Sequence, residues 1–185
     1  MTHVRHVVLD RDGTLNREAA TGWVTATHDW QWEPGVLESL SRLARARCVL
    51  SVVTNQSCIG RGVATRSDVD RVHEHMRASA RAHSVEFHGV YVCPHAPADA
   101  CDCRKPRPKL VALAVAEGGH APGDTLLVGD SLSDLHAGIA AGTRVALVRT
   151  GKGRHVPTSE LPEGVFGVFD TLAQLASELL EVADD

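Results

Sequence analysis

Six short apolar runs are spaced along the chain, and each has the length of a buried strand. They lie at residues 6–10, 49–55, 90–93, 125–130, 144–148 and 164–169. Between them, apolar residues recur with helical spacing at 35–46, 66–83, 108–118 and 133–141, and residues 171–183 close the pattern as an amphipathic helix. Strands that alternate with helices form βαβ units, so we predict an α/β fold with a mostly parallel sheet between helical layers, a Rossmann-like three-layer sandwich.

Polar residues end three of these runs. Asp10 ends the first run, Thr54 and Asn55 end the second, and Asp130 ends the fourth. In open parallel sheets, ligands bind beyond the carboxyl ends of the strands, near the point where the strand order reverses. We therefore expect these side chains to converge on one site. This convergence is stronger evidence for a ligand-binding site than any single motif.

Composition sets the broad class. The 185 residues suit a single domain over 1–185, and 43% hydrophobic with 23% charged residues is typical of a soluble globule. No apolar run approaches the roughly 20 residues of a membrane span, and the start lacks the regions of a signal peptide. We expect a cytoplasmic protein, a monomer, with no membrane partner. A net charge of −4 and 4% aromatic residues argue against a nucleic-acid partner.

The stretch DRDG places Asp10 and Asp12 two residues apart at the end of the first strand. Two carboxylates near one site repel each other unless a cation or a shared proton offsets their charge. Mg²⁺ suits such a site, since it prefers a few carboxylate oxygens together with waters and substrate phosphate, and Asp10 and Asp130 supply them with a backbone carbonyl of the turn. The alternative is a surface turn whose Asp and Gly serve backbone geometry.

Three further stretches suit a phosphate. The hydroxyl of Thr54, followed by the backbone N–H groups of Asn55 and Gln56, suits a phosphate oxygen; the alternative is a polar turn. The segment CRKPRPK at 103–109 supplies cations, unless it is only a solvated basic face. In GDSLSD at 129–134, Asp130 and Asp134 face the same crevice, or Asp134 caps the next helix.

Taken in order, these four stretches resemble the four motifs of the haloacid dehalogenase-like (HAD) phosphatases. The resemblance implies that Asp10 is the nucleophile that forms an aspartyl-phosphate and that Asp12 is the general acid and base. It also implies that Thr54 and Lys105 hold the phosphoryl group, with Asn55, Gln56, Ser57 and Arg104 as substrate-binding residues. Asp10, the main-chain carbonyl of Asp12 and Asp130 would bind Mg²⁺, with Asp134 in support.

The spacing leaves little room for a cap domain. About 44 residues separate Asp10 from Thr54, too few for a large insertion, so we expect an open site covered by loops. One such loop is 16–34, which carries Trp23, Trp30 and Trp32. These rings either shape the substrate entrance or anchor the loop on the core.

Four potential zinc ligands lie within eleven residues. Cys93, His95, Cys101 and Cys103 can close a tetrahedron around one Zn²⁺, and such a closed site is structural. The loop at about 93–103 would then hold Arg104 and Lys105 in position. The alternatives are reduced thiols or a disulfide. Cys48 lies in or next to a strand and is expected in the core.

The same loop, CPH…CDCRKP, resembles two sibling groups of the superfamily. Gly22-Trp23-Val24, TNQS with the following Arg61-Gly62, and LVRTGKG at 147–153 resemble the D-glycero-D-manno-heptose 1,7-bisphosphate phosphatases. The short zinc loop and Lys109-Leu110 resemble the histidinol-phosphate phosphatases. We predict the first activity, release of the 7-phosphate to leave heptose 1-phosphate, with histidinol phosphate or a related small sugar phosphate as the alternative substrate. A bisphosphate needs additional cations, and Arg61, Arg104 and Arg107 are candidates.

Two other classes fit part of this pattern. A signalling receiver also places an aspartate and Mg²⁺ at the edge of a parallel sheet, but an acid and base two residues after the nucleophile would speed the loss of its phosphoryl group. A zinc-dependent nucleic-acid module is the other, and the single Cys/His site with net negative charge disfavours it.

Overall fold

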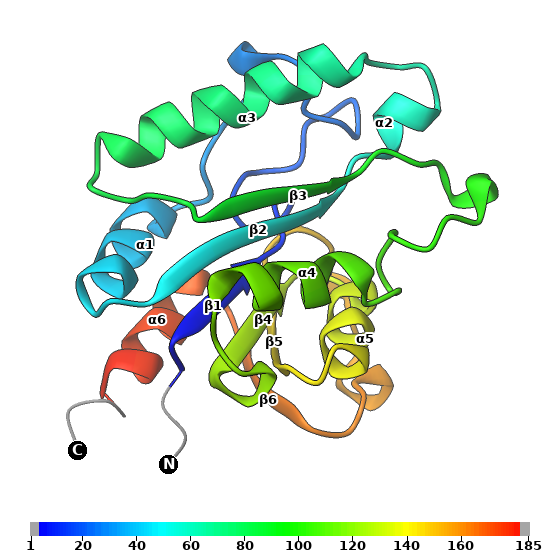
Figure 1. Ribbon diagram of the computed structural model, residues 1–185. Coiled ribbons are helices and arrows are strands. Elements are labelled where there is room, and N and C mark those ends of the chain that lie inside the picture. Colours follow the sequence, from blue (N-terminus) through cyan, green and yellow to red (C-terminus); the bar gives the residue numbers. More distant parts are fainter. Residues whose placement is uncertain (1–3, 182–185) are drawn as a thin grey trace.

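The structure is a computed structural model that describes residues 4–181. Its centre is a six-stranded sheet with the order β3-β2-β1-β4-β5-β6, in which every neighbouring pair is parallel (Figure 1). The strands are β1 (His6–Leu9), β2 (Val49–Asn55), β3 (Gly89–Cys93), β4 (Thr125–Gly129), β5 (Arg144–Val148) and β6 (Val165–Phe169). The predicted parallel α/β sheet is confirmed.

Helices cover both faces of the sheet. They are α1 (Val36–Arg45), α2 (Ser57–Gly60), α3 (Arg66–Arg81), α4 (Lys109–Gly118), α5 (Leu132–Ala140) and α6 (Leu172–Glu181). Helices α1, α3 and α6 lie on one face, and α4 and α5 lie on the other (Figure 1). Short 3₁₀ helices complete the connections: Thr27–Asp29, Pro97–Asp99, Pro122–Asp124, Gly151–His155 and Thr158–Glu160.

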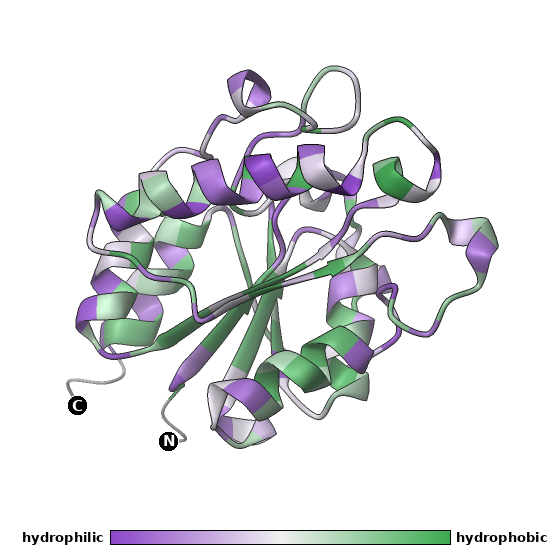
Figure 2. Cartoon of the chain, turned by 45° about the horizontal axis from the view of Figure 1, so that its top comes forward, coloured by the Kyte–Doolittle hydropathy of each residue, from purple (hydrophilic) through white to green (hydrophobic). Residues whose placement is uncertain are grey.

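The alternation of side chains along each strand divides the core into two layers. Val7 and Leu9 of β1 pack with α1, α3 and α6, whereas Val8 between them packs with α4 and α5. The central strands are buried on both faces and therefore read as continuous apolar runs in the sequence. Figure 2 shows this hydrophobic interior, with hydrophilic residues gathered on the outer helical surfaces, most clearly on α3.

The predicted helices and strands occur in the structure with ends that differ by one or two residues. The predicted closing helix extends over 171–183, of which residues 182 and 183 lie outside the described residues. Helix α2 was not predicted, because a helix of four residues is too short to show a period. In the part of the chain that the structure describes, no helix is long and apolar enough to span a membrane.

The strand order positions the site. From β1 the chain proceeds to β2 and β3 on one side, and then returns to β4, β5 and β6 on the other. The order therefore reverses between β1 and β4, and Asp10 and Asp130 follow these two neighbouring strands directly. Loops, short 3₁₀ helices and α2 lie beyond this edge, and none of them forms a large cap domain among the described residues.

Candidate active site

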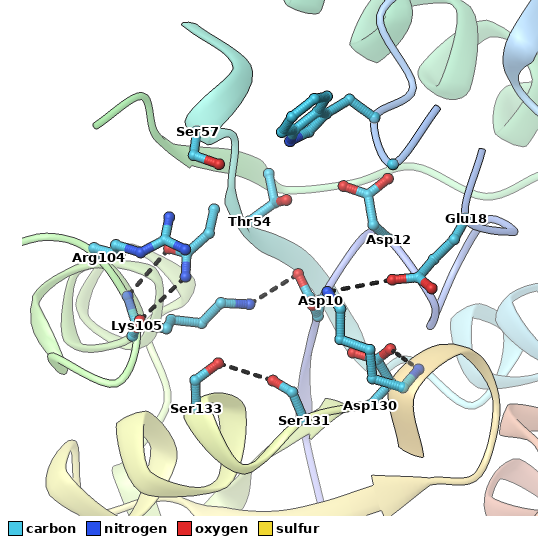
Figure 3. Close-up of a pocket in the computed structure, with 14 residues that line it drawn as sticks. Asp10, Asp12, Glu18, Thr54, Ser57, Arg104, Lys105, Asp130, Ser131 and Ser133 are labelled. Atoms are coloured by element: carbon cyan, nitrogen blue, oxygen red, sulfur yellow. Dashed lines mark hydrogen bonds and ion pairs between the residues drawn. The ribbon is translucent and has the colours of Figure 1, made fainter. Parts of the chain in front are cut away.

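Most of the predicted site residues line one cleft at the carboxyl edge of the sheet (Figure 3). The cleft is open to solvent and has a volume of about 200 Å³. The predicted residues among its lining are Asp10, Asp12, Thr54, Asn55, Ser57, Arg104, Lys105 and Asp130. The convergence that the sequence predicts is therefore present, with side chains from β1, β2, the segment before α4 and the end of β4.

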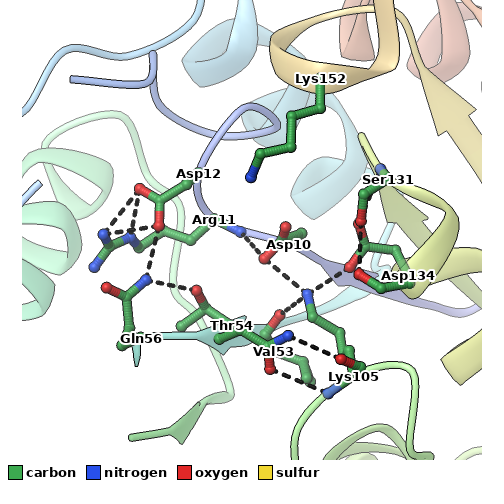
Figure 4. Close-up of polar contacts among 12 residues, drawn as sticks. Asp10, Arg11, Asp12, Val53, Thr54, Gln56, Lys105, Ser131, Asp134 and Lys152 are labelled. Carbon is green, nitrogen blue, oxygen red and sulfur yellow. Dashed lines mark hydrogen bonds and ion pairs between the residues drawn. The ribbon is translucent and has the colours of Figure 1, made fainter. Parts of the chain in front are cut away.

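Lys105 is the central cation of the cleft. Its Nζ lies 2.8 Å from Asp10 Oδ1 and 2.6 Å from Asp134 Oδ1, and donates to the carbonyl of Val53 at 2.7 Å (Figure 4). Burial disfavours the charged lysine, but the two carboxylates outweigh it and raise the pKa of Lys105 above 10.5. A buried, permanently charged ammonium next to Asp10 can stabilise a phosphoryl group there.

Asp10, Asp130 and Asp134 are neighbouring carboxylates that repel one another. Burial raises the pKa of Asp10 to about 6, against the opposing effect of Lys105, and the charge of Asp134 adds to the rise. Burial, Asp10 and Asp134 also raise the pKa of Asp130 to about 8. Oxygens of Asp10, Asp130 and Asp134 lie within 4.8 Å of one another. This set of hard oxygen donors, with more negative charge than Lys105 balances, fits a divalent cation such as Mg²⁺.

Two glycines allow the loops to close around Asp130. Gly13 has φ +81°, and a Cβ there would lie 2.1 Å from Asp130 Oδ2. Gly151 approaches the same oxygen from the loop after β5, where a Cβ would lie 2.2 Å away. The backbone N–H of Lys152 donates to Asp130 Oδ2 at 2.8 Å, which orients the carboxylate. Any larger side chain at these glycines would displace Asp130.

Asp134 combines the two roles that the sequence left open. Its Oδ2 accepts from the backbone N–H of Ser131 at 3.1 Å and from the Ser131 hydroxyl at 2.6 Å, which caps α5. Its Oδ1 faces Lys105. One carboxylate thus fixes the start of α5 and positions the lysine of the cleft.

Asp12 makes an ion pair that the sequence did not predict. Arg11 Nη2 lies 2.8 Å from Asp12 Oδ1, and Gln56 donates to the same carboxylate at 2.7 Å (Figure 4). Asn16 also donates to it, at 3.0 Å. Burial acts to raise the pKa of Asp12, but Arg11 and these hydrogen bonds outweigh it, so that its pKa lies below 3.8. Arg11 is fully buried. From the sequence alone, Arg11 looks like an exposed residue of a turn, so its burial and its pairing with Asp12 could not be predicted.

The residues after β2 differ in part from the prediction. The backbone N–H of Gln56 donates to the carbonyl of Cys93 at 2.7 Å, so the expectation that it meets a phosphate oxygen is wrong. Its side chain is buried and donates to Thr54 Oγ1 at 2.8 Å and to Asp12, which orients both. Asn55 exchanges two hydrogen bonds of 3.1 Å with the backbone of Lys105. Asn55 therefore joins β2 to the lysine segment.

Cys93, His95, Cys101 and Cys103 form a compact group, the Cys/His cluster. The Sγ atom of Cys103 lies 3.3 Å from that of Cys93 and 3.6 Å from that of Cys101, and His95 Nδ1 lies 3.3 Å from Cys103 Sγ. These sulfur atoms are farther apart than the ~2.05 Å of a disulfide bond, so the three cysteines are free thiols in this structure. Ligands around a tetrahedral zinc are separated by about 3.8 Å or slightly less, given a Zn–S bond of about 2.3 Å. The cluster could therefore bind zinc.

The two arginines of the segment after the cluster make different contacts. Arg104 lines the cleft, and its Nη1 lies 3.5 Å from the carbonyl of His95. Arg107 donates to the carbonyls of Ala100 and Cys101 instead, and thus supports the loop. Neither Arg107 nor Arg61 is among the residues that line the cleft.

The three tryptophans divide between the two predicted roles. Trp30 is buried in the core, and Trp32 packs against it with an edge-to-face geometry, the ring centroids 5.0 Å apart. Trp23 lines the cleft. Glu18 of the same loop also lines it, and forms an ion pair of 3.2 Å with Lys152. Glu18 and Lys152 were not predicted as site residues from the sequence, although a lysine just beyond the end of a parallel strand is a usable signal.

Comparison with known proteins places this geometry among phosphatases. The HAD-hydrolase-like family model matches residues 102–175. A D-glycero-beta-D-manno-heptose-1,7-bisphosphate 7-phosphatase of Neisseria meningitidis is 36% identical over 178 residues, which cover 95% of this chain and 94% of that protein. A D-glycero-alpha-D-manno-heptose-1,7-bisphosphate 7-phosphatase of Mycobacterium tuberculosis is 38% identical over 149 residues, 77% of each chain.

A solved structure with a similar name has the same fold as this chain. The crystal structure of the D,D-heptose 1,7-bisphosphate phosphatase from B. bronchiseptica, complexed with magnesium and phosphate, superposes with a TM-score of 0.91 at 33% identity. It covers 96% of this chain and 99% of the other.

Proposed function

This chain belongs to the D-glycero-D-manno-heptose-1,7-bisphosphate 7-phosphatase family of HAD-like phosphoric monoester hydrolases, and we propose that it removes the 7-phosphate of that bisphosphate in a Mg²⁺-dependent reaction. The products are heptose 1-phosphate and inorganic phosphate. The observation that carries the proposal is the buried contact between Asp10 and Lys105, 2.8 Å long, in a cleft that Asp12, Thr54 and Asp130 also line.

Asp10 is the nucleophile of the proposed reaction. One of its oxygens bonds to the phosphorus, the bond from phosphorus to the sugar oxygen breaks, and Asp12 gives that oxygen a proton. Asp12 is ionised in the free protein, and it takes up this proton when the negatively charged phosphate binds beside it. Asp12 then takes a proton from the water that hydrolyses the aspartyl-phosphate. Lys105 and the Thr54 hydroxyl hold the phosphoryl oxygens, and Ser57, Asn55 and Arg104 lie where the rest of the substrate enters.

Metal ions complete the proposal. Asp10, Asp130 and the main-chain carbonyl of Asp12 hold Mg²⁺, with Asp134 in support, and the bound ion supplies positive charge that offsets the carboxylates and the phosphoryl oxygens. The Cys/His cluster holds a structural zinc that keeps the 93–103 loop, and with it Arg104 and Lys105, in place. The magnesium in the crystal structure of the B. bronchiseptica enzyme supports the first assignment.

The test is phosphate release by the purified Mg²⁺-loaded protein. The substrates are the alpha and beta anomers of the heptose 1,7-bisphosphate and histidinol phosphate, with Asp10→Asn as the inactive reference. We expect the highest kcat/KM with a heptose bisphosphate, and the preferred anomer assigns the finer specificity. Higher kcat/KM with histidinol phosphate would move the substrate to the sibling group, and turnover retained in Asp10→Asn would refute the nucleophile.

A further inference from the structure

A fully buried arginine lies beside the active-site carboxylates. Arg11 is 0% exposed and is placed between the two aspartates of the first motif. Neither the sequence motif nor the proposed reaction gives it a task. A guanidinium is costly to bury unless its donors are paired, so each of its partners is informative.

The first partner is the carboxylate of Asp12. Arg11 Nη2 donates to Oδ1 at 2.8 Å and to Oδ2 at 2.9 Å, and Nε donates to Oδ1 at 3.2 Å (Figure 4). Contacts through two nitrogens fix the plane of the carboxylate as well as its position, which a lysine cannot do. Asn16 and Gln56 add one hydrogen bond to each oxygen. The Asp12 side chain nevertheless stays 27% exposed and lines the cleft.

The second partner holds the arginine from behind. Arg11 Nη1 lies 3.1 Å from His73 Nε2, and His73 is a buried residue of α3. Because a guanidinium only donates, His73 accepts through an unprotonated Nε2. Burial and the charge of Arg11 agree with this state, since they lower the pKa of His73 to about 3. Arg11 Nη2 also reaches the carbonyl of Val24 in the loop at 3.4 Å.

We propose that Arg11 is a positioning residue for Asp12, held in place by His73, and that this pair keeps the Asp12 carboxylate directed at the oxygen that leaves the phosphorus. The inference rests on the proposed function, in which Asp12 is the general acid and base. General acid catalysis requires the proton donor to be within hydrogen-bond reach of the leaving oxygen, so a loosened Asp12 slows the reaction although its carboxyl group is still present.

The role predicts a dependence on the leaving group. A sugar oxygen must receive a proton from Asp12 as its bond to phosphorus breaks. The p-nitrophenolate ion leaves p-nitrophenyl phosphate without that proton, since it is a stable anion. The kcat/KM value reports the steps up to this departure and excludes the later hydrolysis. The ratio of kcat/KM for the sugar phosphate to that for the aryl phosphate therefore measures how well Asp12 is positioned.

Asp12→Asn sets the scale of the experiment. We expect it to lower the ratio by about 10² to 10⁴, the usual range for general acid catalysis. Arg11→Met, which fills the space without the charge, should lower the ratio by at least about tenfold, but by less than Asp12→Asn does. Arg11→Lys should lower it less. His73→Leu removes the acceptor and should follow Arg11→Met, whereas His73→Gln keeps an acceptor and should restore most of the ratio.

Met76→Ala is the matched control for lost packing. Met76 lies three residues after His73 on α3, is fully buried, and packs in the hydrophobic core. Its variant should be less stable and keep the wild-type ratio. If Arg11→Met does not fold, the Arg11→Lys and His73→Leu variants carry the test.

The outcomes separate this inference from the function on which it rests. If Asp12→Asn leaves the ratio unchanged, the acid role of Asp12 in the proposed function is wrong. If Asp12→Asn lowers the ratio while Arg11→Lys and His73→Leu keep it, Arg11 has only a structural role and the inference is overturned. A ratio that falls in all of these variants and stays constant in Met76→Ala supports the inference.

Discussion

Replacement of Lys105 by methionine should destabilise the protein and abolish most of its activity. Lys105 is 3% exposed, and its Nζ contacts the carboxylates of Asp10 and Asp134 and the carbonyl of Val53. Methionine fills a similar volume without the charge, so the loss is mainly electrostatic. Removal of one partner from a buried ion pair costs about 3 to 5 kcal/mol, because the remaining charge has no counterion.

We expect the upper half of that range, about 4 to 5 kcal/mol, because one ammonium serves two carboxylates. For a chain of this length that corresponds to a fall in Tm of about 10 °C. Because the folded-state pKa of Lys105 is raised above 10.5, its contribution to stability is complete below pH 10.5 and is lost only as the pH rises through the folded-state pKa. Lys105 itself therefore adds no pH dependence between about pH 6 and pH 9, whereas Asp10, whose pKa is raised to about 6, does.

Urea unfolding in buffer without Mg²⁺ measures the change in stability, and kcat/KM with the heptose bisphosphate measures the change in activity. Lys109→Met is the matched control, since Lys109 belongs to the same basic segment and pairs with Asp102 at the exposed surface. Exposed pairs of this kind contribute little, so this variant should behave as wild type. Equal stability of Lys105→Met and wild type would refute the argument that a buried counterion is required here.

Three further outcomes follow from residues outside that pair. Burial, together with His120 and His88, lowers the pKa of His6 to about 4. The free energy of unfolding should therefore fall as the pH drops from 6.5 toward 4, because the unfolded chain then binds a proton that folded His6 does not. In urea titrations, His6→Gln should reduce this fall between pH 6.5 and pH 5 by about 2 kcal/mol. Metal analysis should find one zinc per chain at the Cys/His cluster, and chelation should raise the KM or unfold the chain; protein purified without zinc and fully active would contradict this assignment. Trp30→Ala should cost about 3 to 5 kcal/mol of stability, whereas Trp23→Ala should mainly raise the KM, and the reverse pattern would show that the two rings have been assigned to the wrong roles.

The elements and the location of the site were predictable because both depend on local order in the sequence. The period of apolar residues identifies a strand or a helix wherever the element has several turns or pleats, and α2 is too short for that. Parallel strands bring their carboxyl ends to one edge, so Asp10, Thr54 and Asp130 had to meet there. The Cys/His cluster was visible because its members lie within eleven residues.

The sequence by itself thus determined which residues reach the active-site edge of the sheet. The spacing of apolar residues and the positions of the strand ends depend only on neighbours along the chain. Only the tertiary structure decided the partners. Arg11 is buried against His73 from a segment more than sixty residues away, and the Gln56 amide is used by Cys93 of the adjacent strand. A hydrogen bond depends on distances of a few tenths of an ångström between segments that are far apart in the chain, and only the packed fold sets those distances.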